Sequence, residues 1–147
     1  MHKAVLGDPE ILILDEPTAG LDPKQRIAIR NYIAKIALEK IVLIATHVVS
    51  DVEYIAKEVI FLKKGQITDL APAHELAAKI DGKVWEVTCK SEEVAKLQQT
   101  YRVINIAQTD TGVTLRVLFE ATPEGDAKAV TPTLEDYYLW VFGESGS

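Results

Sequence analysis

Several residue types and patterns are scarce or missing in this 147-residue sequence, and each absence excludes a class of protein. The only cysteine, Cys89, excludes an internal disulfide framework and fits a reducing compartment. No apolar run approaches the roughly 18 residues that a membrane-spanning helix needs. The formal net charge is −6 and no cluster of lysine and arginine occurs, which argues against nucleic acid as the main partner.

The residues that are present predict a folded, soluble chain. Hydrophobic residues make up 48% of the sequence and charged residues 26%, a balance too apolar for intrinsic disorder. A chain of this length can bury a core without disulfides or metals to hold it together. We therefore expect one compact domain or two small ones.

Two short, continuously apolar runs mark the first part of the chain, Ile11–Leu14 and Ile41–Ala45. A run that is apolar on both faces predicts a strand buried on both sides, as in a parallel sheet. Between them, Lys24–Leu38 has helical periodicity, with Asp22 as a candidate N-cap and Pro23 in the first turn. Strand, helix and strand together predict two neighbouring parallel strands joined by a crossover helix.

The next segments predict further short elements. Ser50–Glu53 has the spacing of a capping box near the start of a short helix. Glu58–Leu62 and Gln66–Leu70 flank a turn and predict a hairpin. Pro72–Ile80 is typical of a helix that ends near Asp81 and Gly82.

The pattern changes after Gly82, where polar and apolar residues begin to alternate. We expect a strand with one solvated face over Lys83–Lys90 and a helix over Ser91–Tyr101. A hairpin over Val103–Glu120 and a loop over Thr122–Lys128 should follow. A final helix should begin at Thr133. The sequence thus predicts an α/β part over residues 1–82 and a small α+β domain over residues 83–147.

Polar residues follow both predicted parallel strands, where ligands of such sheets gather. Asp15 could hold a hydrated Mg²⁺, and Glu16 could orient a water for attack on a phosphate. His47, at the end of the second strand, could bind a phosphate oxygen. Taken singly, each has a simpler interpretation: Asp15 and Glu16 as a turn with a helix cap, His47 as a capping or surface residue, and Asp22 as an N-cap.

The order of these residues resembles that of the ATP-binding-cassette (ABC) transporter ATPases. In Ile11–Pro23, the apolar strand ending at Asp15 is similar to the family's Walker B motif, and Glu16 matches the catalytic carboxylate. Ala19–Asp22 matches the D-loop, and Thr46 with His47 matches the switch-histidine motif. Two further segments are similar to parts of the family: residues 4–9 to the end of the helix after the signature motif, and residues 59–70 to a hairpin that closes the core. Residues 83–143 resemble, more weakly, the C-terminal extension of export-type members.

The resemblance implies roles for four residues and a set of partners. Asp15 would hold the Mg²⁺ shell, Glu16 would act as general base, and His47 would contact the γ-phosphate of ATP. Asp22 would lie at the interface with a second ATPase subunit, so that two subunits enclose two ATP molecules. Hydrolysis would drive membrane permease subunits and energise export, which makes the protein cytoplasmic and peripheral to the inner face of the cell membrane.

Three motifs of the family are missing from these 147 residues: the Gly-x-x-x-x-Gly-Lys-Ser/Thr phosphate loop, the signature motif and the glutamine loop. We therefore expect the C-terminal part of an ABC ATPase, with a parallel sheet that lacks the P-loop strand. Such a fragment should bind ATP poorly, hydrolyse it negligibly, expose apolar surface or an unpaired strand edge, and self-associate.

Other functions remain open at this stage. The chain could belong to a soluble ABC-type ATPase that acts on chromosomes or ribosomes, although it has no coiled-coil heptads or basic arm. It could be a non-catalytic interaction module. A phosphatase with an aspartate nucleophile would want a second acidic residue two positions after Asp15, where this chain has Pro17.

Overall fold

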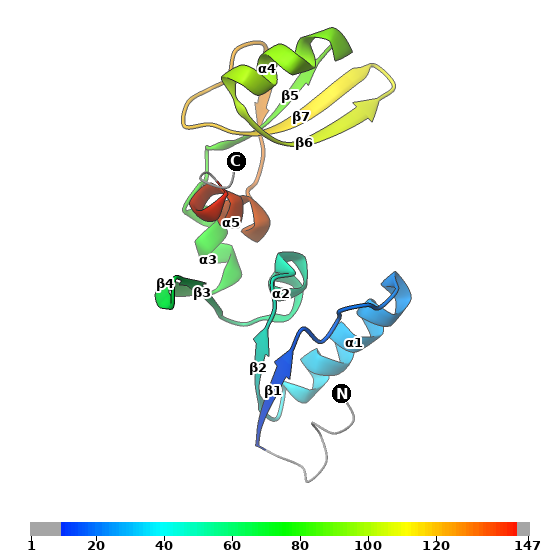
Figure 1. Ribbon diagram of the computed structural model, residues 1–147, viewed down its shortest axis with the longest axis vertical. Helices are drawn as coiled ribbons and strands as arrows, with labels where there is room; N and C mark the ends of the chain where they lie inside the picture. The colour runs from blue at the N-terminus through cyan, green and yellow to red at the C-terminus, as the bar shows by residue number, and fades with distance from the viewer. Residues whose placement is uncertain (1–9, 144–147) are drawn as a thin grey trace. The chain divides into compact units, whose positions relative to one another are not determined.

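Two parallel strands form the centre of the first part of the molecule. In the computed structural model, which describes residues 10–143, β1 (Ile11–Asp15) pairs in parallel with β2 (Ile41–Ala45), in a register that joins Ile11 to Ile41 and Asp15 to Ala45. Helix α1 (Pro23–Ile36) connects them and lies along one side of the pair (Figure 1). The predicted strand–helix–strand unit and its neighbouring parallel strands are confirmed.

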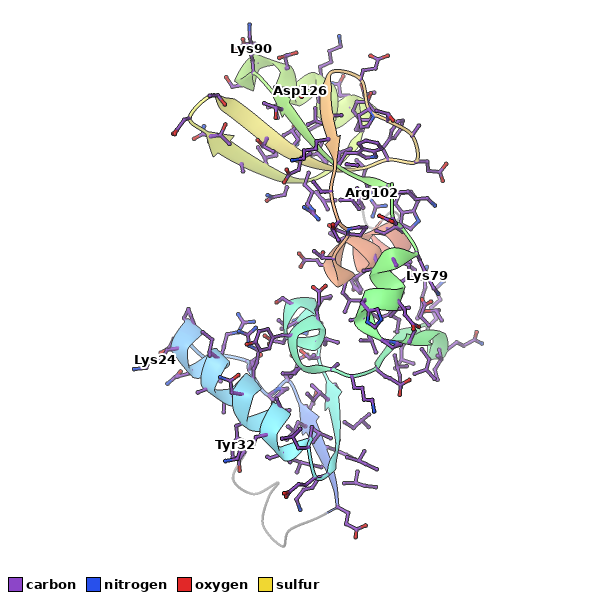
Figure 2. The ribbon with its side chains drawn as sticks, turned by 180° about the vertical axis from the view of Figure 1, so that it is seen from behind. Lys24, Tyr32, Lys79, Lys90, Arg102 and Asp126 are labelled. Atoms are coloured by element: carbon purple, nitrogen blue, oxygen red, sulfur yellow. The ribbon has the colours of Figure 1, made fainter. Side chains whose placement is uncertain are left out.

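Helix α1 begins where the sequence predicts, at a capping box. The Asp22 carboxylate accepts the Gln25 N–H at 2.8 Å, and the Gln25 side chain accepts the Asp22 N–H at 3.2 Å. Pro23 occupies the first turn, where its missing N–H costs nothing. Lys24 and Tyr32 lie on the side of α1 that faces away from the strands (Figure 2). The opposite side carries Ile33, which packs in a buried cluster with residues of β1.

The expectation that both strands are buried on both faces is wrong. Burial alternates along β1: Leu12 and Leu14 lie under α1 with Ile33, whereas the side chains of the other face are 52–67% exposed, namely Ile11, Ile13, Ile41 and Leu43. The reason is that the described residues provide one covering layer, α1, for a two-stranded sheet. We call these four residues the open apolar face; its presence agrees with the expected exposure of apolar surface.

Helix α2 (Val49–Ile55) follows β2 and confirms the short helix predicted near Ser50–Glu53, but its N-cap is Val48, so the predicted capping box is wrong. The helix is capped at Val48, whose own side chain makes no capping hydrogen bond; instead, the Val48 N–H donates to Oγ1 of Thr46 at 3.0 Å. Asp51, in the first turn of this helix, is 3% exposed.

A hairpin completes the first part, as predicted. Strand β3 (Val59–Lys63) pairs antiparallel with β4 (Gln66–Ala71), with an irregularity between Phe61 and Leu62. Gly65 has φ +78° in the turn, which glycine adopts without the steric cost that a β-carbon brings. This hairpin and the β1–β2 pair form separate two-stranded sheets.

The second part is built on a four-stranded antiparallel sheet of order β6-β7-β5-β8. The strands are β5 (Val84–Cys89), β6 (Arg102–Thr109), β7 (Gly112–Leu118) and β8 (Asp126–Ala129). The helices are α3 (Ala73–Ala78), the short 3₁₀ helix η2 (Ser91–Glu93), α4 (Val94–Thr100) and α5 (Leu134–Phe142). The predicted loop over Thr122–Lys128 is wrong in part, because β8 begins within it.

Residues from most of these strands form the core of the second part. Its buried members are Val87, Tyr101, Val113, Leu115 and Val117, and Trp85, Val94, Leu97 and Phe119 pack against them. The Trp85 indole N–H donates to the carbonyl of Phe119 at 3.1 Å, so its polar atom is satisfied.

Helix α5 is fastened to the sheet by an ion pair. Asp136, which is 2% exposed, accepts two hydrogen bonds from the Arg116 guanidinium of β7, at 2.9 and 2.6 Å. Burial raises the pKa of the Asp136 carboxyl, but the bonds from Arg116 and Thr133 outweigh it, so its pKa lies below the ordinary 3.8. Arg102, labelled in Figure 2, adds a hydrogen bond from β6 to the carbonyl of Leu139.

The chain divides into two compact units after Ala73, nine residues before the boundary that we placed after residue 82 from the sequence. Residues 74–82, assigned from sequence to the first part, therefore group with the second. Within residues 10–143 no helix is long and apolar enough to cross a membrane. The similarity noted at residues 4–9 lies outside the described residues.

Candidate functional site

The turn after β1 places Glu16 against the end of β2. The Glu16 N–H donates to the carbonyl of Ala45 at 2.8 Å, which extends the strand pairing by one residue. The backbone then turns sharply, since Glu16 has φ +47°, a left-handed conformation that is uncommon for a residue with a side chain. This turn directs the Glu16 side chain toward the segment that follows β2.

The Glu16 carboxylate binds two consecutive residues of that segment. Its Oε1 lies 2.7 Å from the ring Nδ1 of His47 and accepts the His47 backbone N–H at 3.2 Å. Its Oε2 accepts the hydroxyl of Thr46 at 3.0 Å. The structure thus brings Glu16 and His47 together, at the carboxyl ends of two neighbouring parallel strands, where ligands of such sheets bind.

The hydrogen bonds around Glu16 determine its protonation. Partial desolvation raises the pKa of the Glu16 carboxyl, but the hydrogen bonds from His47 and Thr46 outweigh it and hold the pKa below the ordinary 4.5. Glu16 is therefore a carboxylate at neutral pH. The His47 side chain is 85% exposed, so its ring is accessible to a ligand.

Asp15 is exposed at the end of β1, on the same side of the strand as Ile11 and Ile13. No group of three or more possible ligands from His, Cys, Asp and Glu occurs among residues 10–143, so this part of the chain has no protein-only metal cage. One carboxylate beside a nucleotide is, however, a sufficient protein contribution for Mg²⁺, which keeps several waters and takes phosphate oxygens. Asp15 fits that use.

Asp22 has a structural task in addition to the one that the resemblance implies. Its carboxylate caps α1, as described above, which is the simpler interpretation weighed from the sequence. The segment Ala19–Asp22 leads directly from the Glu16 turn into this cap. Gly20 has φ +75° within it, a conformation that glycine adopts readily.

A buried group that the sequence analysis missed lies next to the site. Asp51 of α2 accepts the hydroxyl of Thr18 at 2.5 Å and a guanidinium N–H of Arg26 at 3.1 Å, and Arg30 lies 3.6 Å from the same carboxylate. Thr18 and Asp51 are 5% and 3% exposed. The spacing of Arg26 and Arg30, four residues apart on one helix face, was the available signal for a shared acidic partner.

The sequence of the chain is similar to those of known proteins. No protein-family model matches the chain. Over 160 aligned positions it is 28% identical to an uncharacterized ABC transporter ATP-binding protein of Bacillus subtilis, covering 99% of this chain and 51% of the relative. Similar coverage, 99% of the chain and 44% of the relative, is found at 29% identity with another such protein of Synechocystis.

This chain is a homologue of the ABC transporter ATP-binding proteins. An energy-coupling factor transporter ATP-binding protein of Listeria welshimeri is also 32% identical over 114 aligned positions, which cover 76% of this chain and 39% of that protein. The chain spans about half the length of the first two relatives that it matches. In this homologue, the contact between Glu16 and His47 lies at the carboxyl ends of two parallel strands.

Proposed function

We propose that this chain is part of the ATP-hydrolysing subunit of an ABC transporter, with Glu16 and His47 at its catalytic site. The observation that supports the proposal is the contact between the Glu16 carboxylate and His47 at the end of the β1–β2 pair. A carboxylate that stays ionised at neutral pH can accept a proton from a water or hold that water for attack on a phosphate. Removing such a group costs roughly 10²–10⁴-fold in rate.

The other site residues take roles that fit their positions. Asp15, exposed beside Glu16, would hold Mg²⁺ through water, and the ion would supply charge neutralisation at the nucleotide phosphates. His47 would contact the γ-phosphate through its accessible ring. Asp22, while capping α1, would lie at the interface with a second ATPase subunit. We propose that the first unit corresponds to a partial P-loop core and the second to the accessory domain of export-type members.

The membrane partners follow from the same proposal. The Listeria relative is named as an ATP-binding protein of an energy-coupling factor transporter. By analogy, this chain would act with permease subunits, at the cytoplasmic side of the membrane, and its pairing partner would be a second ATPase subunit. We propose export as the direction, on the similarity of residues 83–143 to the export-type extension.

These 147 residues contain no phosphate-binding loop, so the proposal requires that another polypeptide segment provide it. The purified chain should therefore release no phosphate from Mg-ATP above background. Adding the N-terminal half of the Bacillus subtilis relative, as a fusion, should restore Mg²⁺-dependent hydrolysis.

Two variants of that fusion make the test specific to the site. Glu16→Gln should abolish hydrolysis while ATP still binds, and Glu10→Gln, which changes an exposed glutamate outside the site, should leave the rate unchanged. Hydrolysis at the parental rate by the Glu16→Gln fusion would show that Glu16 is not the catalytic carboxylate. Turnover by the 147-residue chain alone would overturn its predicted inactivity.

A further inference from the structure

Asp51 connects three segments of the first unit through one buried carboxylate. Its Oδ2 accepts the Thr18 hydroxyl from the loop after β1, and its Oδ1 accepts from Arg26 and lies near Arg30, both on α1. The Arg30 guanidinium also lies over the ring of Tyr54, 4.2 Å from its centroid, which fastens α1 to α2 a second time. Asp51 itself belongs to the first turn of α2.

The place of these residues in the sequence relates this cluster to the site. Thr18 is two residues after Glu16, and Asp51 is four residues after His47. The loop that carries Glu16 is therefore joined twice to the segment that follows β2: by the Glu16–His47 contact before α2, and by the Thr18–Asp51 hydrogen bond within α2. The Thr18–Asp51 hydrogen bond is the better shielded from water, because both of its side chains are buried whereas the His47 ring is exposed.

The ion pairs with Arg26 and Arg30 already join α2 to α1. The Thr18 hydroxyl is the additional contact, because it brings the loop into the same cluster. A charge-assisted hydrogen bond between two buried partners is costly to break, so it ties the loop to α2.

We propose that Asp51 is a positioning residue: through Thr18 it fixes the loop of residues 16–22 relative to α2, and so keeps Glu16 in contact with His47. The mechanistic consequence rests on the proposed function. Residues 19–22 resemble the loop that faces the second ATPase subunit in the family, so a displacement of that loop would reach the His47 segment through Thr18 and Asp51.

The test reads the Glu16–His47 contact directly and needs no nucleotide. A carboxylate only accepts hydrogen bonds, so Glu16 favours a proton on Nδ1 of the neutral His47 ring. Ring ¹⁵N shifts of the full 147-residue chain, recorded under conditions in which the ring is neutral, report which nitrogen carries the proton. Glu16→Ala gives the reference spectrum for the broken contact.

Thr18→Val should move the His47 ring shifts toward those of Glu16→Ala, whereas Thr18→Ser, which keeps the hydroxyl, should restore the parental shifts. Asp51→Asn should give the same loss as Thr18→Val. Ile33→Val, which loosens the core under α1 without touching the cluster, should leave the shifts in place. Parental shifts in folded Thr18→Val would overturn the proposal. Thr18→Val keeps both arginine contacts of Asp51, so it tests the positioning role even if Asp51→Asn does not fold.

The two proposals can fail separately. If the His47 shifts respond as expected but the Glu16→Gln fusion hydrolyses ATP at the parental rate, the positioning role is supported and the proposed function is wrong. If the fusion behaves as expected and the Thr18→Val shifts do not change, the positioning role alone is overturned.

Discussion

One carboxylate oxygen of Glu16 contacts His47 at two places, the ring Nδ1 at 2.7 Å and the backbone N–H at 3.2 Å. Because that oxygen can only accept, the neutral ring should carry its proton on Nδ1, leaving Nε2 as an acceptor. A neutral His47 in this arrangement cannot donate to a phosphate oxygen. To do so it must either become protonated or release Glu16.

The first prediction concerns this tautomer. In the parental chain the Nδ1–H form of neutral His47 should dominate, and in Glu16→Ala the population should shift toward the Nε2–H form. Long-range ¹H–¹⁵N spectra measure both, and a His47→Gln variant identifies the ring among the three histidines of the chain. Identical His47 tautomer populations in parent and Glu16→Ala would mean that the contact does not persist in solution.

The second prediction concerns the open apolar face. Sheets with exposed apolar residues and unpaired edges associate, so the parental chain should form oligomers that depend on concentration. Ile13→Lys with Leu43→Lys should shift the chain toward monomer in sedimentation velocity and reduce binding of an apolar dye. Leu38→Lys replaces an 84% exposed leucine outside the face and is the matched control. A parental chain that stays monomeric at high concentration would contradict the prediction.

The third prediction concerns the core under α1. Ile33 is 2% exposed and packs on Leu12 and Leu14, so Ile33→Ala should lower the free energy of unfolding of this unit by about 2–5 kcal/mol. Both tryptophans, Trp85 and Trp140, lie in the other unit, so amide exchange along β1 and β2 is the suitable measurement. Ile27→Ala, at a residue 49% exposed on the same helix, should cost much less. Equal effects of the two substitutions would show that α1 does not pack as described.

The fourth prediction concerns Asp136 and pH. Because the pKa of Asp136 is lowered in the folded state, its ion pair stabilises the second unit fully above the ordinary value of 3.8. That stability is lost as the pH falls below 3.8 toward the folded-state pKa. Asp136→Asn should cost about 3 kcal/mol at pH 7, since it removes the buried charge that pairs with Arg116, and should cost progressively less in acid.

Denaturant unfolding followed by tryptophan fluorescence tests this, because both tryptophans belong to that unit. Glu92→Gln, at an exposed position of η2 in the same unit, serves as the control. A difference between parent and Asp136→Asn that stayed constant from pH 7 to pH 2.5 would show that the stabilisation does not come from ionisation of Asp136.

Local patterns were sufficient to predict most of the elements. Asp22 before Pro23 located the start of α1, and the apolar runs located β1 and β2. The exposure of Ile13 and Leu43 could not be predicted in this way. An apolar run indicates that a strand can be buried on both faces, but it does not show which helices or strands are present to cover those faces. Strand β8 has the composition Asp-Ala-Lys-Ala, which has low strand propensity, and forms only by pairing with β5.

The candidate site likewise combines residues that could be predicted from the sequence with one that could not. Glu16 and His47 could be paired from sequence because each directly follows a strand, and neighbouring parallel strands bring their ends together. Asp51 was missed because its partners Thr18 and Arg26 are 33 and 25 residues away, while a nearby Ser50 offered a local explanation as part of a cap. A contact at that separation is decided by how α1 and α2 pack.

The left-handed backbone at Glu16 implies that the chain gives up stability at this position. Glycine at position 16 would adopt φ +47° without the penalty of about 1–2 kcal/mol that a residue with a β-carbon bears there. Asparagine would also be better suited to it. A search for thermostable variants, carried out without regard to activity, should therefore select a substitution at position 16 only if the relief of backbone strain exceeds the loss of the hydrogen bonds to Thr46 and His47. Retention of glutamate there by natural chains would be a sign of selection for chemistry over folding.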